Sequence, residues 1–314
     1  MIPTTMINPD RLQTLNIILD GLMRRYKERV PDVGAIIETM AAEGLIRHES
    51  DIENDHIAFR TMDVEHLGIG SLEKIFIYHG YTKRDRYNFA QKKLTAYWYQ
   101  PPTSTYPRIF ISELRVHELS PEVQAIIRSY TGEVTADPVE RLDLNDGLAV
   151  DAFLHQPLWR RPTKQDYDRL SAESEYAAWV IYNRYYLNHF TVSVHNLPPG
   201  ANTIAQFNDF LERHNFRLND SGGKIKLSSD GKLVQSSTVA EMVDAAFANG
   251  QGGLVMHRIA GSYVEFAERR ILDEFAHLAP DHLERHHRRD GFDPESANNI
   301  FESTYRHQTN KRMA

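Results

Sequence analysis

Two histidines stand at equivalent places in two similar segments and are candidate metal ligands. His56 lies in the segment DHIAFRT, and His189 begins the segment HFTVSVH. In both segments apolar residues alternate with polar ones, which is typical of a strand that has its polar side chains on one face. Most histidines in a chain that contains fifteen are surface or hydrogen-bonded residues. The repeated placement nevertheless favours His56 and His189 as partners in one site.

A third ligand is expected from the segment Tyr263 to Glu268. Its alternation puts Glu265 on one face of a strand and Glu268 on the other. Periodicity favours Glu265 only slightly, because Val264 and Phe266 could instead form the buried face. Glu268 therefore stays open as a rival ligand, and a surface glutamate is the ordinary alternative for either residue.

Two imidazoles and one carboxylate on one face of an octahedral ion leave three coordination positions open. That is enough for a bidentate 2-oxo acid together with O2, which is the arrangement of Fe(II) oxygenases. Zinc accepts the same ligands, usually with four-coordinate geometry. The residue types alone do not decide between the two metals.

Arg60 lies four residues beyond His56 on the same predicted strand face. At roughly 3.3 Å per residue this places it about 13 Å along the strand. A guanidinium there could bind the far carboxylate of a dicarboxylic substrate through two parallel hydrogen bonds while the near end chelates the metal. An ordinary ion pair is the alternative.

The elements that would carry these residues form a repeated pattern. After helices expected near Leu12–Leu22 and Val33–Gly44, the first copy has a strand at His56, a helix over Ser71–His79 and further strands up to Glu118. We predict an α+β fold in which two βαβββ modules join into one open, barrel-like sheet. The predicted divisions are an N-terminal helical segment, a first module, an inserted helical segment, a second module and a C-terminal helical tail, at residues 1–49, 50–119, 120–185, 186–270 and 271–314.

The second copy is expected to follow the order of the first. Its predicted parts after the strand at His189 are a helix over Thr203–His214, two strands, a helix over Val239–Ala248 and a last strand over Ser262–Arg269. In the tail, the charged run Glu284–Arg289 is interpreted as a solvated helix face rather than a metal cluster.

Composition excludes several classes of function. The net charge of −7 offers no broad cationic surface for nucleic acid, and the absence of cysteine excludes disulfides and thiolate sites. No apolar run approaches roughly eighteen residues, and Met1 to Asn8 lacks a basic segment followed by an apolar one. We therefore predict a cytoplasmic protein without a membrane or nucleic-acid partner. The oligomeric state is not indicated.

With these motifs in this order, the sequence resembles the vicinal oxygen chelate superfamily and, within it, the 2-oxoadipate dioxygenase/decarboxylase family, also called hydroxyglutarate synthase. The resemblance rests on the segments DHIAFRT, NHFT, KLVQSST and YVEF. It implies that His56, His189 and Glu265 bind Fe(II), that Arg60 binds the substrate carboxylate, and that Ser296 in the segment SANNIF also contacts substrate. Tyr263, Thr191 and Ser193 are candidates to line the pocket or to contact and orient the metal ligands.

The resemblance also implies a reaction. A 2-oxo acid chelates Fe(II), O2 adds, CO2 leaves, and the shortened acid is hydroxylated, so that 2-oxoadipate gives 2-hydroxyglutarate. The family's usual substrate suggests a role in lysine degradation. The small-molecule partners expected are the 2-oxo acid and O2.

Two alternatives stay open. A glyoxalase-like lyase or isomerase could use the same scaffold with Zn or Ni and a fourth protein ligand. Glu113 is the candidate because it lies on the last strand of the first module, at the place that corresponds to Glu265 in the second. A non-catalytic binding module is the other alternative. An inward-facing set of two histidines and a carboxylate argues against it, since metal-free binding does not need such a set.

Overall fold

The computed structural model describes residues 8–313, which form two compact units. The described residues of the first unit fall within Met1–Tyr26, Ala58–Leu187 and Ala245–His257, and those of the second fall within Lys27–Ile57, Asn188–Asp244 and Arg258–Ala314. The predicted location rests in part on the segment Met1 to Asn8. Of that segment, only Asn8 lies within the described residues.

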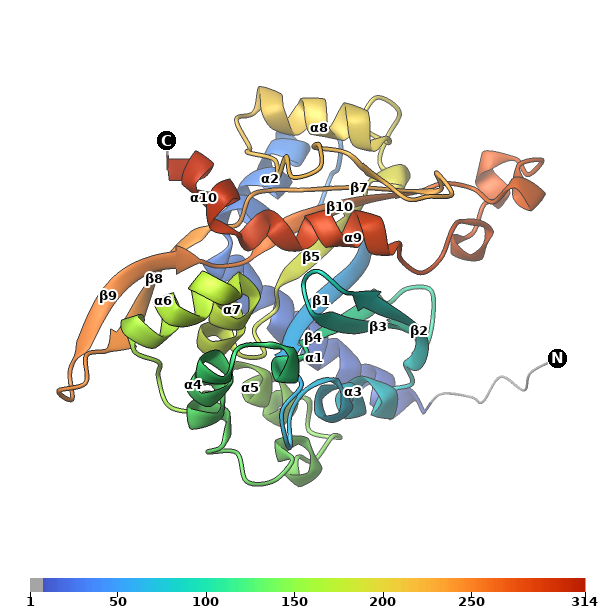
Figure 1. Ribbon diagram of the computed structural model, residues 1–314. Coiled ribbons are helices and arrows are strands. Elements are labelled where there is room, and N and C mark those ends of the chain that lie inside the picture. The colour runs from blue at the N-terminus through green and yellow to red at the C-terminus, as the bar shows by residue number, and fades with distance from the viewer. Residues whose placement is uncertain (1–7, 314) are drawn as a thin grey trace. The chain divides into compact units, whose positions relative to one another are not determined.

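The first unit has the predicted βαβββ order. Its elements are β1 (Asn54–Met62, of which the part from Ala58 belongs here), α3 (Ile69–Tyr78), β2 (Thr82–Phe89), β3 (Leu94–Gln100) and β4 (Arg108–Leu114). Neighbouring strands are hydrogen-bonded in the order β2-β3-β4-β1, with β2, β3 and β4 antiparallel (Figure 1). The buried side chains of α3, among them Leu72, Ile75 and Phe76, recur at helical spacing and pack into the core.

The first unit also contains several α-helices, most of them between residues 120 and 185. They are α1 (Pro9–Arg29), α4 (Pro121–Thr131), α5 (Gly147–His155), α6 (Lys164–Glu173) and α7 (Glu175–Asn183). Side-chain caps begin three of the four inserted α-helices after a serine or threonine: Ser120 before α4, Thr163 before α6 and Ser174 before α7. Asp146 caps α5 in the same way.

The second unit repeats the strand and helix order around the predicted ligands. It contains the beginning of β1, then β5 (His189–Ser193), α8 (Ile204–Arg213), β6 (Lys226–Leu227), β7 (Leu233–Ser237) and β10 (Tyr263–Arg269). Strands are hydrogen-bonded in the order β1-β5-β10-β7-β6. Strand β10 is parallel to β5 and antiparallel to β7.

Three further helices belong to this unit: α2 (Pro31–Ala42), α9 (Pro294–Ile300) and α10 (Arg306–Met313). Helix α9 packs against β6 and β7 and crosses this part of the sheet in Figure 1. The charged run predicted as a solvated helix face contains only a short 3-10 turn, Arg285–His287. Its arginines, Arg285, Arg288 and Arg289, each form a hydrogen bond with a residue of β1 or β10.

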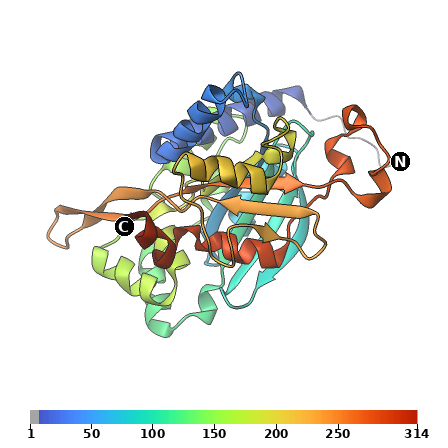
Figure 2. The same cartoon turned by 90° about the horizontal axis from the view of Figure 1, so that it is seen from above.

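A further predicted element is wrong. The segment expected to form a helix over Val239–Ala248 forms strand β8 (Met242–Ala248), which pairs with β9 (Leu254–Ala260) in a separate two-stranded ribbon (Figure 2). Its apolar residues satisfy a helical pattern, but Ala245 and Phe247 alternate into the interior, where Phe247 contacts Tyr167 and Tyr182. Pairing with β9 and these ring contacts override the local helix propensity.

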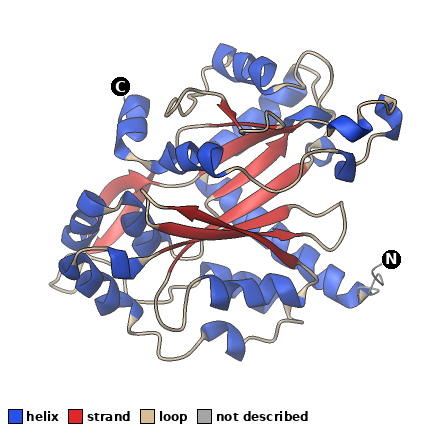
Figure 3. Cartoon of the chain, turned by 45° about the vertical axis from the view of Figure 1, so that its right-hand side comes forward, coloured by secondary structure: helices blue, strands red, loops and turns tan. Residues whose placement is uncertain are grey.

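The chain is an α+β protein, as predicted, with helices and strands interspersed along it (Figure 3). The five segments predicted from sequence stay predictions. Among the described residues, no helix is both long enough and apolar enough to span a bilayer.

Candidate metal centre

Donor atoms of His56, His189 and Glu265 converge within the second unit. His56 Nε2 lies 3.2 Å from His189 Nε2 and 3.5 Å from Glu265 Oε1, and His189 Nε2 lies 3.1 Å from Glu265 Oε2. All three residues are buried, and among the described residues theirs is the one such group of His, Asp or Glu donors, all within 4.8 Å of one another.

These separations fit a first-row divalent ion. An ion about 2.1 Å from each donor sets neighbouring donors about 3.0 Å apart on one face of an octahedron and about 3.4 Å apart in a tetrahedron. The observed distances of 3.1, 3.2 and 3.5 Å lie at or close to both values. The group can therefore bind a metal, and two imidazoles with one carboxylate suit Fe(II) and Zn alike.

The register of the strands explains why the donors meet. Tyr263 of β10 lies opposite His189 of β5, and Glu265 lies opposite Thr191, so these four side chains share one face of the sheet. The hydroxyl of Thr191 lies 3.2 Å from His56 Nε2, which brings the β1 histidine onto the same face. The ring of Tyr263 packs 4.9 Å from that of His189.

Each donor group has a polar partner that orients it. Asp55 Oδ1 lies 2.8 Å from Nδ1 of His56, and Asn188 Oδ1 lies 3.2 Å from Nδ1 of His189. Because a carboxylate or amide oxygen only accepts, each Nδ1 carries the proton and each Nε2 presents its lone pair to the cluster. The side-chain amide of Gln235 donates to Glu265 Oε1. Residues that form hydrogen bonds with metal ligands commonly orient the ligands in this way.

Burial and the charge of Glu265 act in opposite directions on the pKa values of two basic groups, His56 and Lys226. Burial alone would lower the pKa of His56, but the charge of Glu265 and the hydrogen bond to Asp55 raise it above its ordinary value. Lys226 lies opposite Gln235 on β6 and is buried, which lowers its pKa to about 8 against the attraction of Glu265. Its ammonium donates to the carbonyl of Asn219 at 2.6 Å.

The rival carboxylate Glu268 is engaged elsewhere. Its Oε2 accepts from the backbone N–H of Ile204 at 2.9 Å, at the beginning of α8, and its Oε1 lies 2.8 Å from Nε of Arg270. A negative charge at this helix terminus is favourable.

Glu113 accepts the same kind of hydrogen bond, at the beginning of a helix, in the first unit. Its Oε2 accepts from the N–H of Ile69 at 3.0 Å, at the beginning of α3. We predicted that Glu113 corresponds to Glu265, but this hydrogen bond makes it the counterpart of Glu268. Since β4 and β10 have equal length, Phe110 holds the place that Glu265 holds in β10. The candidate fourth ligand of a glyoxalase-like site is thus occupied in capping a helix.

Arg60 and Ser296 are both buried. In the first unit, the guanidinium carbon of Arg60 lies 5.1 Å from the ring centre of Tyr176 and 5.2 Å from that of Trp179. In the second unit, Ser296 is 2% exposed on α9, and its hydroxyl has no hydrogen-bond partner among the described residues. A cavity of about 560 Å³ in the first unit, lined by residues that include Asp63, His66 and Arg128, contains none of the predicted site residues.

Sequence reasoning missed Asp55, Gln235, Arg269 and Lys226 as parts of this site. Asp55 carried a usable signal, because an acceptor residue directly precedes the histidine in both copies, as Asp55-His56 and Asn188-His189. The other residues lie in predicted strands, but their contacts depend on strand register, which alternation does not provide.

The sequence profile of the family described as 2-oxoadipate dioxygenase/decarboxylase matches residues 18–281. A curated relative from Arabidopsis thaliana, a chloroplastic 2-oxoadipate dioxygenase/decarboxylase, is 38% identical over 308 residues, which cover 94% of this chain and 78% of the relative. Another from Oryza sativa subsp. japonica, named chloroplastic/amyloplastic, is 40% identical over 308 residues, which cover 95% of this chain and 80% of the relative.

Two solved structures are similar as well. The crystal structure of the hydroxyglutarate synthase from Oryza sativa in complex with 2-oxoadipate matches with a TM-score of 0.83 and 39% identity, covering 96% of this chain and 94% of that one. A glyoxalase superfamily protein from Ralstonia eutropha JMP134 matches with a TM-score of 0.68 and 21% identity, covering 87% and 83%. The second likeness concerns the fold alone, and it agrees with the predicted vicinal-oxygen-chelate-like architecture.

The names of the relatives correct one prediction. Both curated relatives are plastid proteins by name, so the predicted cytoplasmic location is wrong. The profile match and the identity over most of the chain confirm the resemblance inferred from the motifs. The chain belongs to the 2-oxoadipate dioxygenase/decarboxylase family.

Proposed function

We propose that this chain is an Fe(II)-dependent dioxygenase/decarboxylase that acts on a 2-oxo dicarboxylic acid such as 2-oxoadipate. In the proposed reaction 2-oxoadipate and O2 give 2-hydroxyglutarate and CO2, with both oxygen atoms of O2 entering the hydroxy acid. The observation that carries the proposal is the buried group of His56, His189 and Glu265 in a member of this family. A role in lysine degradation stays a prediction.

Fe(II), when bound, supplies adjacent coordination positions for the 2-oxo acid group and for O2. His56, His189 and Glu265 would hold the ion from one side, since their donor atoms converge, and leave the other side to the ligands. The protons on Nδ1 of both histidines are retained by Asp55 and Asn188, which keeps Nε2 available. Burial of the three side chains excludes bulk water.

Arg60 is proposed to bind the distal carboxylate of the substrate. It lies on the same strand as His56 with even spacing, so the two side chains leave β1 on the same face. Its guanidinium is buried, and a buried cation is stabilised by an anionic partner with fork geometry. The hydroxyl of Ser296, buried without a partner among the described residues, is proposed to donate to the substrate as well.

The test is to load the purified chain with Fe(II) without oxygen, add 2-oxoadipate and then admit O2. We expect one CO2 released per O2 consumed, and with ¹⁸O2 two labelled atoms in 2-hydroxyglutarate and none in CO2. His189→Ala, which removes a ligand, should abolish turnover. If no 2-oxo dicarboxylic acid supports O2 uptake by the loaded wild-type chain, the proposal fails.

Exchange of the metal distinguishes the proposed reaction from the glyoxalase-like alternative. Zn- or Ni-loaded chain should be inactive toward 2-oxoadipate, because neither ion reduces O2 in such a site. Oxygen-independent turnover of a hemithioacetal by the Zn or Ni form would instead support the glyoxalase-like function.

A further inference from the structure

The two copies of the histidine motif differ in the charge of the residue that orients the ring. Asn188 is neutral, whereas Asp55 is a carboxylate with 1% exposure. A buried carboxylate that lacks a cationic partner is strongly unfavourable. Orientation of His56 by Asp55 therefore needs a second residue that orientation of His189 by Asn188 does not need.

Arg269 is that second residue. Its Nε lies 2.6 Å from Asp55 Oδ2 and its Nη2 lies 2.8 Å from Asp55 Oδ1, so the fork of the guanidinium holds both carboxylate oxygens. Arg269 is also 1% exposed. The oxygen that accepts from His56 is thus the one that Nη2 contacts, and the two hydrogen bonds fix the plane of the carboxylate.

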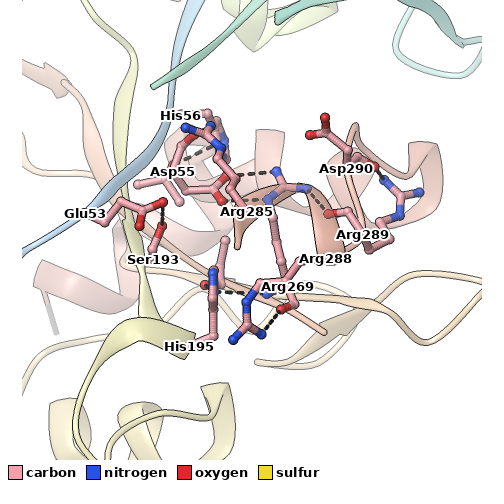
Figure 4. A network of polar contacts seen from close by, with 12 residues as sticks. Glu53, Asp55, His56, Ser193, His195, Arg269, Arg285, Arg288, Arg289 and Asp290 are labelled. Atoms are coloured by element: carbon pink, nitrogen blue, oxygen red, sulfur yellow. Dashed lines mark hydrogen bonds and ion pairs between the residues drawn. The ribbon is translucent and has the colours of Figure 1, made fainter. Parts of the chain in front are cut away.

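The remaining nitrogen of Arg269 is held by the chain that follows β10. Nη1 donates to the carbonyls of Gly291 at 2.8 Å and of Arg289 at 3.1 Å. Arg288 donates back to the carbonyl of Arg269 at 2.8 Å. Figure 4 shows the guanidinium of Arg269 between Asp55 and Arg289. The guanidinium is therefore fixed on the side of Asp55 and on the opposite side.

The same segment also confines the ring of His56 directly. Phe292 meets the imidazole edge-on, with ring centres 4.7 Å apart at 88°. The guanidinium carbon of Arg269 lies 5.4 Å from the centre of the Phe292 ring. Contacts from Asp55 and Phe292 thus restrict both the rotation and the tilt of the ring.

We infer that Asp55 and Arg269 act as a pair of positioning residues that hold His56 ready to bind the metal, with Nδ1 protonated and Nε2 directed at the cluster. The inference rests on the metal-binding part of the proposed function. It predicts that the pair sets metal affinity separately from its contribution to folding.

The test uses Co²⁺ as the probe, because its absorption and its paramagnetically shifted NMR signals report on the ligands without turnover. The main variant is D55L/R269M, which removes both charges and the oxygen that accepts from His56 Nδ1, and apolar replacement of a buried pair is compatible with folding. We expect an apo protein with a wild-type circular dichroism spectrum and a Co²⁺ affinity lowered about 10- to 100-fold. The exchangeable Nδ1–H signal of His56 in the Co²⁺ form should broaden or disappear, while that of His189 persists.

Arg269→Lys gives a second measurement if the double variant does not fold. It keeps a cation beside Asp55 but removes the fork, so we expect a smaller loss of Co²⁺ affinity than in the double variant and faster exchange of the His56 N–H. Wild-type affinity and exchange in either folded variant overturn the inference. Failure of the wild-type chain itself to bind Co²⁺ or Fe²⁺ would instead overturn the proposed function.

The first unit provides a matched control. There, Asp151 Oδ1 lies 3.2 Å from Nδ1 of His155, and Asp151 Oδ2 lies 2.9 Å from Nη2 of Arg25. This is the same combination of residues without a metal cluster. D151L/R25M should leave Co²⁺ affinity and the His56 signal unchanged, and an equal loss there would reduce the Asp55–Arg269 effect to general destabilisation.

Discussion

Gln235 donates a hydrogen bond from its side-chain amide to Oε1 of Glu265, although the residue directly opposite Gln235 on β10 is Ala267. The amide therefore reaches diagonally along the strand to the carboxylate. The other carboxylate oxygen, Oε2, lies 3.1 Å from His189 Nε2, so Gln235 holds one oxygen while the other faces the histidine.

We expect Gln235→Leu to weaken metal binding by about 10-fold, because loss of a group that orients a ligand costs about that much affinity. The side chain is buried in β7, and leucine has a similar size, so the fold should persist. Competition with a chromogenic chelator measures the effect. Gln206→Leu, on the exposed face of α8, is the control and should bind metal as the wild type does. Equal affinity in both variants would contradict the role given to Gln235.

The pairing of the histidines could be predicted because duplication leaves a local trace. His56 and His189 each stand within a strand that alternates, directly after an acceptor residue, and both features are visible within a few residues of sequence. The βαβββ order of the first module and most helices were predictable for the same reason.

Other parts of the site depend on contacts between distant residues. Alternation left Glu265 and Glu268 open, because both faces of β10 are buried and either could have been the polar interior. The backbone N–H of Ile204 in the first turn of α8 donates to Glu268, and Glu265 lies beside the two histidines. Asp55 and Arg269 are 214 residues apart in sequence, and no local pattern predicts their fork.

Stability should fall as the pH is lowered from about 6.5 to about 4 because of His195. Burial and the charge of Arg288 lower the pKa of this histidine to about 4, and its Nδ1 accepts from the backbone N–H of Arg269. Above pH 6.5 the ring is neutral in both states. Below it, the unfolded chain takes up a proton that the folded chain resists, so folding loses about 2 kcal/mol after allowance for solvent screening of a partly exposed ring.

His195→Asn tests this pH dependence, because an amide oxygen can accept the same hydrogen bond and does not titrate. Urea unfolding of the apo chain at several pH values should give the variant a flatter stability profile between pH 6.5 and 4 than the wild type. His282→Asn, at an exposed site, should leave the slope unchanged. Parallel profiles for the wild type and His195→Asn would mean that other groups cause the acid sensitivity.

Arg60→Gln should impair turnover of dicarboxylic substrates selectively. Loss of a charge-assisted fork costs roughly 3 kcal/mol, so we expect kcat/KM for 2-oxoadipate to fall about 100-fold. The value for 2-oxohexanoate, which has the same chain length and no second carboxylate, should change little. Oxygen-uptake kinetics with both acids measure the ratio, and an unchanged preference for the dicarboxylate would exclude Arg60 as its ligand.

Substitution by alanine should have opposite effects on stability at Ser296 and at Ser303. The hydroxyl of Ser303 lies 3.0 Å from Asn219 Nδ2 and 2.9 Å from the hydroxyl of Ser237, whereas that of Ser296 is buried with no partner among the described residues. Removal of an unsatisfied buried hydroxyl relieves a desolvation penalty, while removal of a bonded one leaves its partners unsatisfied.

Ser296→Ala should therefore stabilise the apo chain by about 1 kcal/mol, and Ser303→Ala should destabilise it by about the same amount. If the Ser296 hydroxyl donates to substrate, Ser296→Ala should also raise KM for 2-oxoadipate several-fold while leaving metal affinity unchanged. Urea unfolding and steady-state kinetics measure the two effects. A gain in stability without a change in KM would leave the hydroxyl as an unsatisfied core group, whereas a loss of stability would show that it has a structural partner in the folded chain.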